Sequence, residues 1–301
     1  MSSSIKNVIV VGASGAVGRP VVTALLEAGF QVTALTRDSS NATFPKSVKV
    51  VKTDYSRESL DQAFQDQHAV VSTIAGSGVG TQITLIDAAV AAGVKVFIPS
   101  EYGLDTQPAN APEVIPLIAH KITAVNHLRS FKDKISWTVL VTGALFDWNF
   151  DFPGFGGWNL PARTAVIWDG GDVPFEATNL PQTGKAVAAI LKNPESTKDQ
   201  YVYINSFTTT QNEVLKELES ATGDKFKVET ASTEETWKNG QAKVAKGGEG
   251  LMEGIIATIH AGYYGKGDLN NYSKKGLWND KLGLPKETLA ATVKEIVASH
   301  K

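Results

Sequence analysis

Short apolar runs alternate with helical patterns along the first half of the chain. Runs of this length and continuous apolar character are typical of parallel strands buried on both faces. They lie at residues 8–11, 31–36, 48–52, 69–74, 96–98 and 137–141. Helical patterns at residues 17–28, 82–92 and 113–131 lie between them, and another begins after Ser56. Because strands and helices alternate through short connections, the pattern predicts an α/β fold with a doubly wound parallel sheet.

The pattern changes after about residue 142. Residues 151–159 combine aromatic side chains with glycines and indicate a loop. Two further strands are expected at 165–168 and 201–205, and helices are expected at 182–191, 211–222, 250–259 and 285–298. We therefore expect two rigidly paired parts: residues 1–150 as the main domain, and residues 151–301 as a smaller α/β, substrate-binding region. The smaller part should cover the carboxyl edge of the sheet, where open α/β folds bind ligands.

Composition and charge narrow the function classes. The chain carries 29 Lys and Arg against 31 Asp and Glu, a formal net charge of −2, which argues against nucleic acid as the main partner. It has no cysteine, so disulfides, zinc–thiolate sites and iron–sulfur clusters are excluded. No apolar stretch approaches the roughly 18 residues of a membrane helix, and the five histidines show no metal-ligand spacing. We expect a cytoplasmic protein that binds no metal and no membrane.

A glycine-rich turn follows the first strand. Gly12-Ala13-Ser14-Gly15-Ala16-Val17-Gly18 has the spacing G-x-x-G-x-x-G and leads directly into a helix. Gly12 permits a tight turn, Gly15 lets the backbone approach a pyrophosphate, and Gly18 lets the helix pack close to the strand. In this context the turn predicts a Rossmann-type dinucleotide site contacted by the three glycines with Ser14, Ala16 and Val17; a turn without a ligand is the alternative.

The end of the second strand indicates which dinucleotide binds. An NAD site usually carries Asp or Glu there, whereas this chain has Thr36-Arg37. A guanidinium matches the 2′-phosphate of NADPH, so NADPH is the predicted cofactor, although a solvated surface arginine is the alternative. Small residues close the fourth strand, and Thr73, Ala75 and Gly76 are predicted to let a cofactor ribose pass.

Several motifs together resemble the NmrA-like and isoflavone reductase-like family of atypical short-chain dehydrogenases. They are Gly12–Gly18, Thr36–Arg37, the segment Phe97–Gly103 (Phe-Ile-Pro-Ser-Glu-Tyr-Gly) and a lysine about twenty residues later. The Tyr-x-x-x-Lys pair of ordinary short-chain dehydrogenases is absent. In the reductase branch of the family, the lysine at the position of Lys121 is catalytic. The resemblance thus implies that Lys121 donates a proton as hydride arrives; Tyr102 is the alternative donor, and a surface helix lysine is the non-catalytic alternative.

The substrate side of the site is predicted from aromatic residues. Phe146, Trp148 and Phe152 are candidates for a wall against a flat aromatic substrate, although half of the aromatic residues in this stretch would equally suit a core. The resulting hypothesis is an NADPH-dependent reductase of a small natural product, aromatic or unsaturated. The alternative is a non-catalytic NmrA-like sensor of dinucleotides that binds a partner protein. Lys121 favours the enzyme, because a sensor does not need it.

Overall fold

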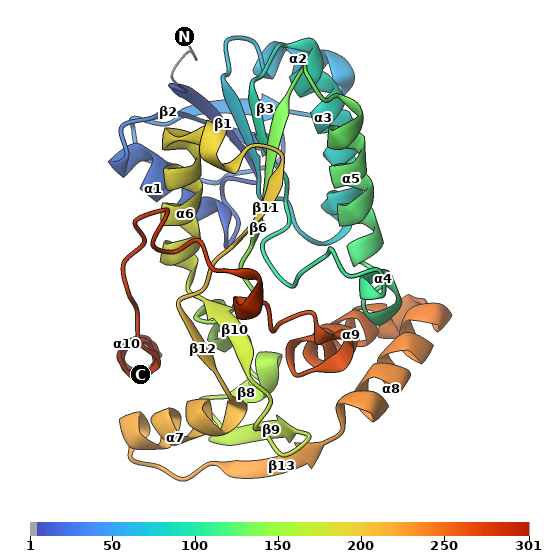
Figure 1. Cartoon of the computed structure of the whole chain (residues 1–301), viewed down its shortest axis with the longest axis vertical. Coiled ribbons are helices and arrows are strands. Elements are labelled where there is room, and N and C mark those ends of the chain that lie inside the picture. The colour runs from blue at the N-terminus through green and yellow to red at the C-terminus, as the bar shows by residue number, and fades with distance from the viewer. Residues whose placement is uncertain (1–4, 301) are drawn as a thin grey trace.

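The chain forms two parts that lie one above the other in the computed structural model (Figure 1). The structure describes residues 5–300, without the side chains of residues 76, 77 and 79. The upper part in Figure 1 is a large sheet between two layers of helices, and the lower part holds two small sheets with further helices. Among the described residues, no helix is both long and apolar enough to cross a lipid bilayer.

The large sheet has seven parallel strands in the order β11-β6-β5-β4-β1-β2-β3. Its strands are β1 (Asn7–Val11), β2 (Gln31–Arg37), β3 (Lys49–Thr53), β4 (Ala69–Ser72), β5 (Val96–Ile98), β6 (Ser136–Val141) and β11 (Gln200–Tyr203). The strand order reverses beside β1, which lies between β4 and β2. This confirms the predicted doubly wound α/β fold and places the ligand-binding crevice of such folds at the carboxyl end of β1.

Helices cover both faces of this sheet, which explains the continuous apolar strands. One face carries α1 (Gly18–Glu27) and α6 (Leu180–Lys192), and the other carries α2 (Arg57–Ala63), α3 (Gln82–Ala91) and α5 (Ile118–Ser130) (Figure 1). In β1, Val8 and Val10 point into the first layer while Ile9 and Val11 point into the second. Each apolar residue of the strand is therefore buried, on one side or the other.

The structure corrects two expectations about the first half. The single helix expected at 113–131 is broken into α4 (Ala111–Val114) and α5, because Pro116 lacks the N–H that a continuous helix needs.

The boundary expected at residue 150 does not separate the large sheet from the two small sheets. After residue 150 the chain returns to the large sheet with α6 and β11, and β11 pairs in parallel with β6.

The second part is built around two three-stranded sheets. One has the order β12-β10-β7 and the other the order β13-β9-β8. Their strands are β7 (Ala144–Leu145), β8 (Trp158–Asn159), β9 (Thr164–Trp168), β10 (Phe175–Thr178), β12 (Phe207–Thr209) and β13 (Lys227–Ala231). The helices are α7 (Gln211–Thr222), α8 (Thr233–Lys246), α9 (Leu251–Tyr263) and α10 (Leu289–Ser299). The sequence pattern predicted β9, α7, α9 and α10 but missed α8 and the other strands.

Candidate functional site

The glycine-rich turn between β1 and α1 requires glycine at two positions. Gly12 has a φ of +79°, which disfavours any residue with a side chain. A Cβ at Gly18 would lie 2.2 Å from the Gly12 carbonyl oxygen, so only glycine lets α1 start this close to the turn. The Gly15 N–H closes the turn by donating to the Gly12 carbonyl at 2.9 Å. Gly15 itself is exposed and faces no side chain within contact distance.

The start of α1 has free hydrogen-bonding capacity for an anion. In the described part of the chain, no side chain caps α1, and its first turn contains no acidic residue. The first N–H groups of a helix carry a partial positive charge. Arg19 donates its N–H to the Gly15 carbonyl at 3.1 Å and Pro20 has no N–H, so the N–H groups from Ala16 to Gly18 are the donors that could meet an anion. Ser14 and Val17 are half-buried and Ala16 is exposed. This cradle has the shape and donors for the pyrophosphate of a dinucleotide, and the contact stays a prediction.

The end of β2 presents a cation beside this turn. Arg37 is the exposed last residue of β2, and Thr36 before it is buried. Within the described chain, the Thr36 hydroxyl has no hydrogen-bond partner. Lys52 holds the loop after β2 by donating from Nζ to the main-chain oxygens of Asp38, at 3.3 Å, and of Ser40. The Arg37 guanidinium thus lies at the end of a strand, beside a loop that Lys52 holds in place.

Thr73 supports the turn from the next strand. Its main-chain N–H and its hydroxyl both donate to the Val11 carbonyl at 2.8 Å. A Cβ at Gly12 would lie 2.9 Å from the main-chain oxygen of Thr73. Ala75 is exposed at the same edge. The surroundings of Gly76, also predicted to contact the cofactor, lie outside the described residues.

Lys121 lies on α5 and is anchored to the loop after β5. Its Nζ donates to the main-chain carbonyl of Glu101. Burial lowers the pKa of Lys121, and the negative charge of Glu101 opposes this effect. Ser100 fixes the loop, since its N–H donates to Gln82 Oε1 at 2.7 Å and its hydroxyl donates to the Ile74 carbonyl at 2.6 Å. The lysine is therefore held at the carboxyl edge, although its role there stays a prediction.

Tyr102, the alternative proton donor, lies in the core. Its side chain is only 7% exposed and packs among the apolar residues under α1 and α6. Burial raises the pKa of its hydroxyl far above the usual value, and this hydroxyl has no hydrogen-bond partner among the described residues. This position does not favour proton transfer to a bound ligand.

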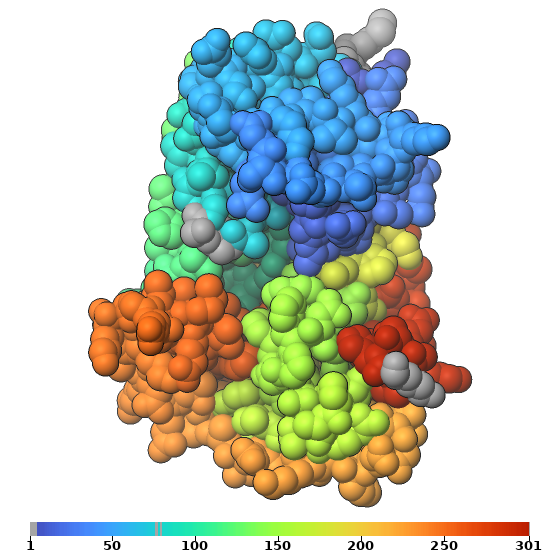
Figure 2. Space-filling model, turned by 180° about the vertical axis from the view of Figure 1, so that it is seen from behind, coloured from blue at the N-terminus to red at the C-terminus, as the bar shows by residue number. Residues whose placement is uncertain are grey.

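The three predicted substrate-contacting aromatic residues separate into two groups. Phe146 is 1% exposed and packs edge to face against Phe150 and Phe207, so its predicted place in the pocket wall is corrected to a place in the core. Trp148 is half-buried, and Phe152 is 50% exposed, with ring centroids 5.1 Å apart. Figure 2 shows the surface hollowed between the blue residues of the first part and the green and orange residues of the second.

The carboxyl group of Glu101 is a feature that sequence reasoning missed. In the sequence Glu101 was only part of the segment Phe97–Gly103, but its side chain is 2% exposed and accepts a hydrogen bond from Thr106 at 3.0 Å. Burial raises the pKa of Glu101 to about 7, while the Lys121 charge opposes this rise. The signal in the sequence was an acidic residue three positions after the end of a buried strand and twenty residues before a lysine.

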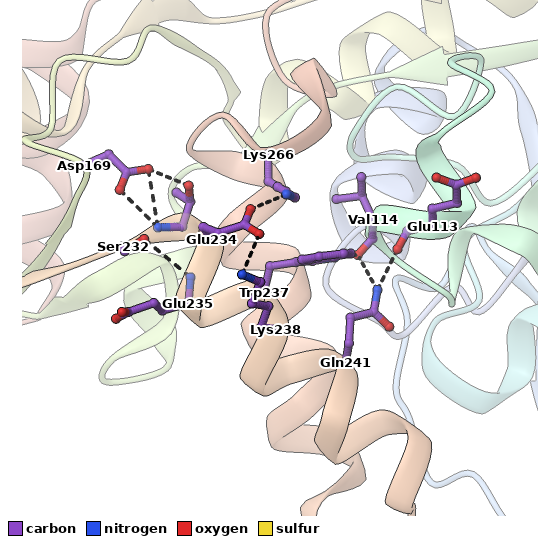
Figure 3. A network of polar contacts seen from close by, with 11 residues as sticks. Glu113, Val114, Asp169, Ser232, Glu234, Glu235, Trp237, Lys238, Gln241 and Lys266 are labelled. Carbon is purple, nitrogen blue, oxygen red and sulfur yellow. Dashed lines mark hydrogen bonds and ion pairs between the residues drawn. The ribbon is translucent and has the colours of Figure 1, made fainter.

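Helix α8 braces the segment that leads into α5 (Figure 3). Trp237 and Gln241 point from α8 toward α4 and donate to the main-chain carbonyls of Val114, at 3.0 Å, and Glu113, at 2.6 Å. Lys266 lies over the Trp237 ring, 4.2 Å from its centroid, and pairs with Glu234. These contacts join the second part to the helix pair that carries Lys121.

The chain matches one family model over most of its length. The model describes the NmrA-like family and matches residues 4–273. Curated relatives are similar over comparable spans. The chain is 35% identical over 300 residues to the oxidoreductase aprR of Aspergillus flavus, covering 97% of each chain. It is 31% identical over 252 residues to the oxidoreductase poxI of Penicillium oxalicum, covering 82% of this chain and 80% of that one.

A solved structure shares the fold. The protein AtPrR2, determined with NADP⁺ and (+)-pinoresinol, superposes with a TM-score of 0.79. The alignment covers 98% of this chain and all of that chain, at 22% sequence identity. The similarity extends across both parts of the chain, so the two-part architecture is common to both proteins.

Proposed function

The chain belongs to the NmrA-like family, and from this membership and the geometry of the turn we propose that it is an NADPH-dependent reductase. The observation that carries the proposal is the uncapped start of α1 beside the exposed Arg37, at the carboxyl edge where Lys121 is anchored. The relatives that share about a third of its sequence over most of its length are named oxidoreductases. A sensor without catalytic activity has less support.

The residues present fit NADPH as the cofactor. The turn Gly12–Gly18 would hold the pyrophosphate on its N–H groups, and Arg37 would pair with the 2′-phosphate. Thr73 and Ala75 would lie along the ribose at the end of β4. When bound, NADPH supplies a hydride for the reduction. The structurally similar protein that was solved with NADP⁺ supports this assignment.

Lys121 would supply the proton. Its Nζ is held at the carboxyl edge by the Glu101 carbonyl, and partial burial lowers its pKa toward the range useful for a general acid. The substrate we propose is a small aromatic or unsaturated compound, because Trp148 and Phe152 expose aromatic surface in the second part. A flat ring would gain contact with these side chains.

The proposal is tested by binding and turnover together. Calorimetric titration with NADPH measures binding, and loss of the absorbance of reduced nicotinamide across a panel of enones and aromatic ketones measures turnover. We expect NADPH binding and reduction of at least one panel member. Absence of NADPH binding would refute the proposal, whereas tight binding without turnover across the panel would favour the sensor.

A further inference from the structure

The carboxyl group of Glu101 is buried with one oxygen unsatisfied. Glu101 Oε2 accepts a hydrogen bond from the Thr106 hydroxyl at 3.0 Å. Among the described residues, Oε1 has no hydrogen-bond partner and is inaccessible to solvent. A buried carboxylate in this setting is costly unless a positive charge lies close by. The environment of Glu101 must therefore supply a cation or keep the group protonated.

Lys121 is the cation that the fold brings to Glu101. Its Nζ is anchored by a hydrogen bond to the main-chain oxygen of the same residue, which brings the amine close to Glu101, although the two side chains form no direct ion pair among the described residues. The two groups act on each other: Glu101 favours the charged form of Lys121, and Lys121 favours the charged form of Glu101. Each group is thus the main electrostatic partner of the other.

The other polar and charged groups around Glu101 do not replace Lys121. Asp105 is a second acidic group in the same loop, and Lys275 pairs with it. The Thr106 hydroxyl, which donates to Glu101, lies 3.5 Å from the hydroxyl of Tyr201 on β11. Neither Asp105 nor Tyr201 brings a positive charge to the carboxyl group. The charge balance at this site therefore depends on the Glu101–Lys121 pair.

We propose that the Glu101 carboxylate is a positioning residue that keeps Lys121 in its protonated, donating form. The inference rests on the proposed function, in which Lys121 gives its proton to the substrate. After that transfer the neutral amine takes up one proton from water, and the negative charge of Glu101 stabilises the ammonium ion that forms. Each reduction thus consumes one proton from solvent, and Glu101 is unchanged at the end.

The first test needs neither substrate nor cofactor. The rate of trace acetylation of the Lys121 amine, followed by peptide mass spectrometry across a pH series, gives the pH at which the amine loses its proton. In Glu101→Gln the midpoint should fall by about one pH unit, since an opposite charge at close range shifts a pKa by about one to three units. Glu113→Gln, which removes an exposed carboxylate from α4, should leave the midpoint unchanged. An unchanged midpoint in folded Glu101→Gln would overturn the inference.

A reciprocal measurement covers the case in which Glu101→Gln does not fold. Carbon-13 NMR titration of the Glu101 carboxyl group compares the wild type with Lys121→Met. Removal of the ammonium should move the Glu101 titration to higher pH, and an unmoved titration would overturn the inference. Both tests report on the pair alone, so they can succeed even when no reductase activity is found. If activity is found, turnover of Glu101→Gln should decline at a lower pH than that of the wild type, because Lys121 loses its proton earlier.

Discussion

The indole N–H of Trp237 donates to the main-chain carbonyl of Val114 at 3.0 Å, and so joins α8 to the end of α4. Pro116, two residues further on, supplies no N–H for a continuing helix, which leaves carbonyls at this break in need of other donors. Helix α8 satisfies one of them directly before the helix that carries Lys121. The second part of the chain therefore supports the position of the candidate proton donor.

Replacing Trp237 with phenylalanine should destabilise the protein. The ring remains available to Lys266, but the Val114 carbonyl loses its indole donor. We expect the free energy of unfolding to fall by about 1 kcal/mol, the usual contribution of one such hydrogen bond. Urea denaturation measures this change. The matched control is Trp278→Phe, since within the described chain the Trp278 indole N–H makes no hydrogen bond; equal losses in both variants would contradict the prediction.

Arg37 should set the cofactor preference. We expect NADPH to bind at least tenfold more tightly than NADH, which corresponds to about 1.4 kcal/mol. Arg37→Asp should reverse the preference, because a carboxylate repels the 2′-phosphate and accepts hydrogen bonds from a 2′-hydroxyl. Calorimetric titration with both cofactors measures the ratio, and Arg57→Asp is the control for a lost exposed arginine. Equal affinities in the wild type would exclude this role for Arg37.

Gly15 should be essential for binding but not for folding. Its backbone conformation suits any residue, and a Cβ there would lie 3.2 Å from the Gly12 carbonyl oxygen, a tight contact. The remaining bulk of a valine would fill the space proposed for the pyrophosphate. Gly15→Val should therefore abolish NADPH binding while its circular dichroism stays native, and Gly250→Val is the control. A folded Gly15→Val variant that binds NADPH normally would show that the turn is not the phosphate site.

Lys121→Met should separate catalysis from binding. Methionine keeps most of the volume of the side chain but carries no proton to donate. Turnover should fall by about 10²–10⁴-fold, the usual contribution of a general acid, while the NADPH affinity changes by less than about threefold, or roughly 0.65 kcal/mol. Lys121→Arg should not restore turnover, because a guanidinium keeps its proton at neutral pH. Single-turnover oxidation of NADPH makes the measurement, with Lys134→Met as control; unchanged turnover would move the acid role away from Lys121.

His260 should make stability depend on pH. Its Nε2 accepts the Gly156 N–H at 2.9 Å, and burial lowers its pKa from 6.5 to about 4. The stability from keeping this histidine neutral is complete above pH 6.5 and is lost as the pH falls through 4. The full loss amounts to about 3 kcal/mol.

His260→Gln tests this dependence, since a glutamine amide oxygen can accept the same N–H without titrating. Glu101 and Asp147, whose pKa values burial raises to about 7 and about 6, act in the opposite direction and favour the folded state as the pH falls. The comparison of the two proteins cancels their contribution. Urea denaturation at several pH values should show the wild type losing stability relative to the variant between pH 6.5 and 4, and a constant difference would refute the prediction.

The architecture of the first part could be predicted because its strands are buried on both faces and its turns use residues with special backbone properties. The helix expected after Ser56 also begins there, and the Ser56 hydroxyl caps it by accepting the Ser59 N–H at 3.2 Å. The second part was harder to predict. Helix α8 has few buried side chains and shows little apolar periodicity, and β10 contains Glu176, a fully buried carboxylate that accepts hydrogen bonds from Asn205 and Thr208.

The residues of the candidate site likewise fall into those that local sequence predicts and those that depend on how distant segments pack. The glycine turn and Arg37 follow from local sequence, because each lies at a strand end that the apolar pattern locates. Nothing local distinguishes Phe146 from Phe152, since both lie in one aromatic stretch, and only the packing of Phe150 and Phe207 decides which of them is buried. The pairing of Glu101 with Lys121 depends likewise on how α5 lies against the loop after β5.

The return of β11 to the large sheet has a consequence for synthesis on the ribosome. The sheet edge at β6, which ends at Val141, stays open until Tyr203 at the end of β11 has been translated. At typical synthesis rates of 5–20 residues per second, the nascent chain waits roughly 3 to 12 seconds with this edge unpaired. During that interval the unpaired main-chain groups along β6 can pair with strands of other chains, and the translation of β11 ends this exposure.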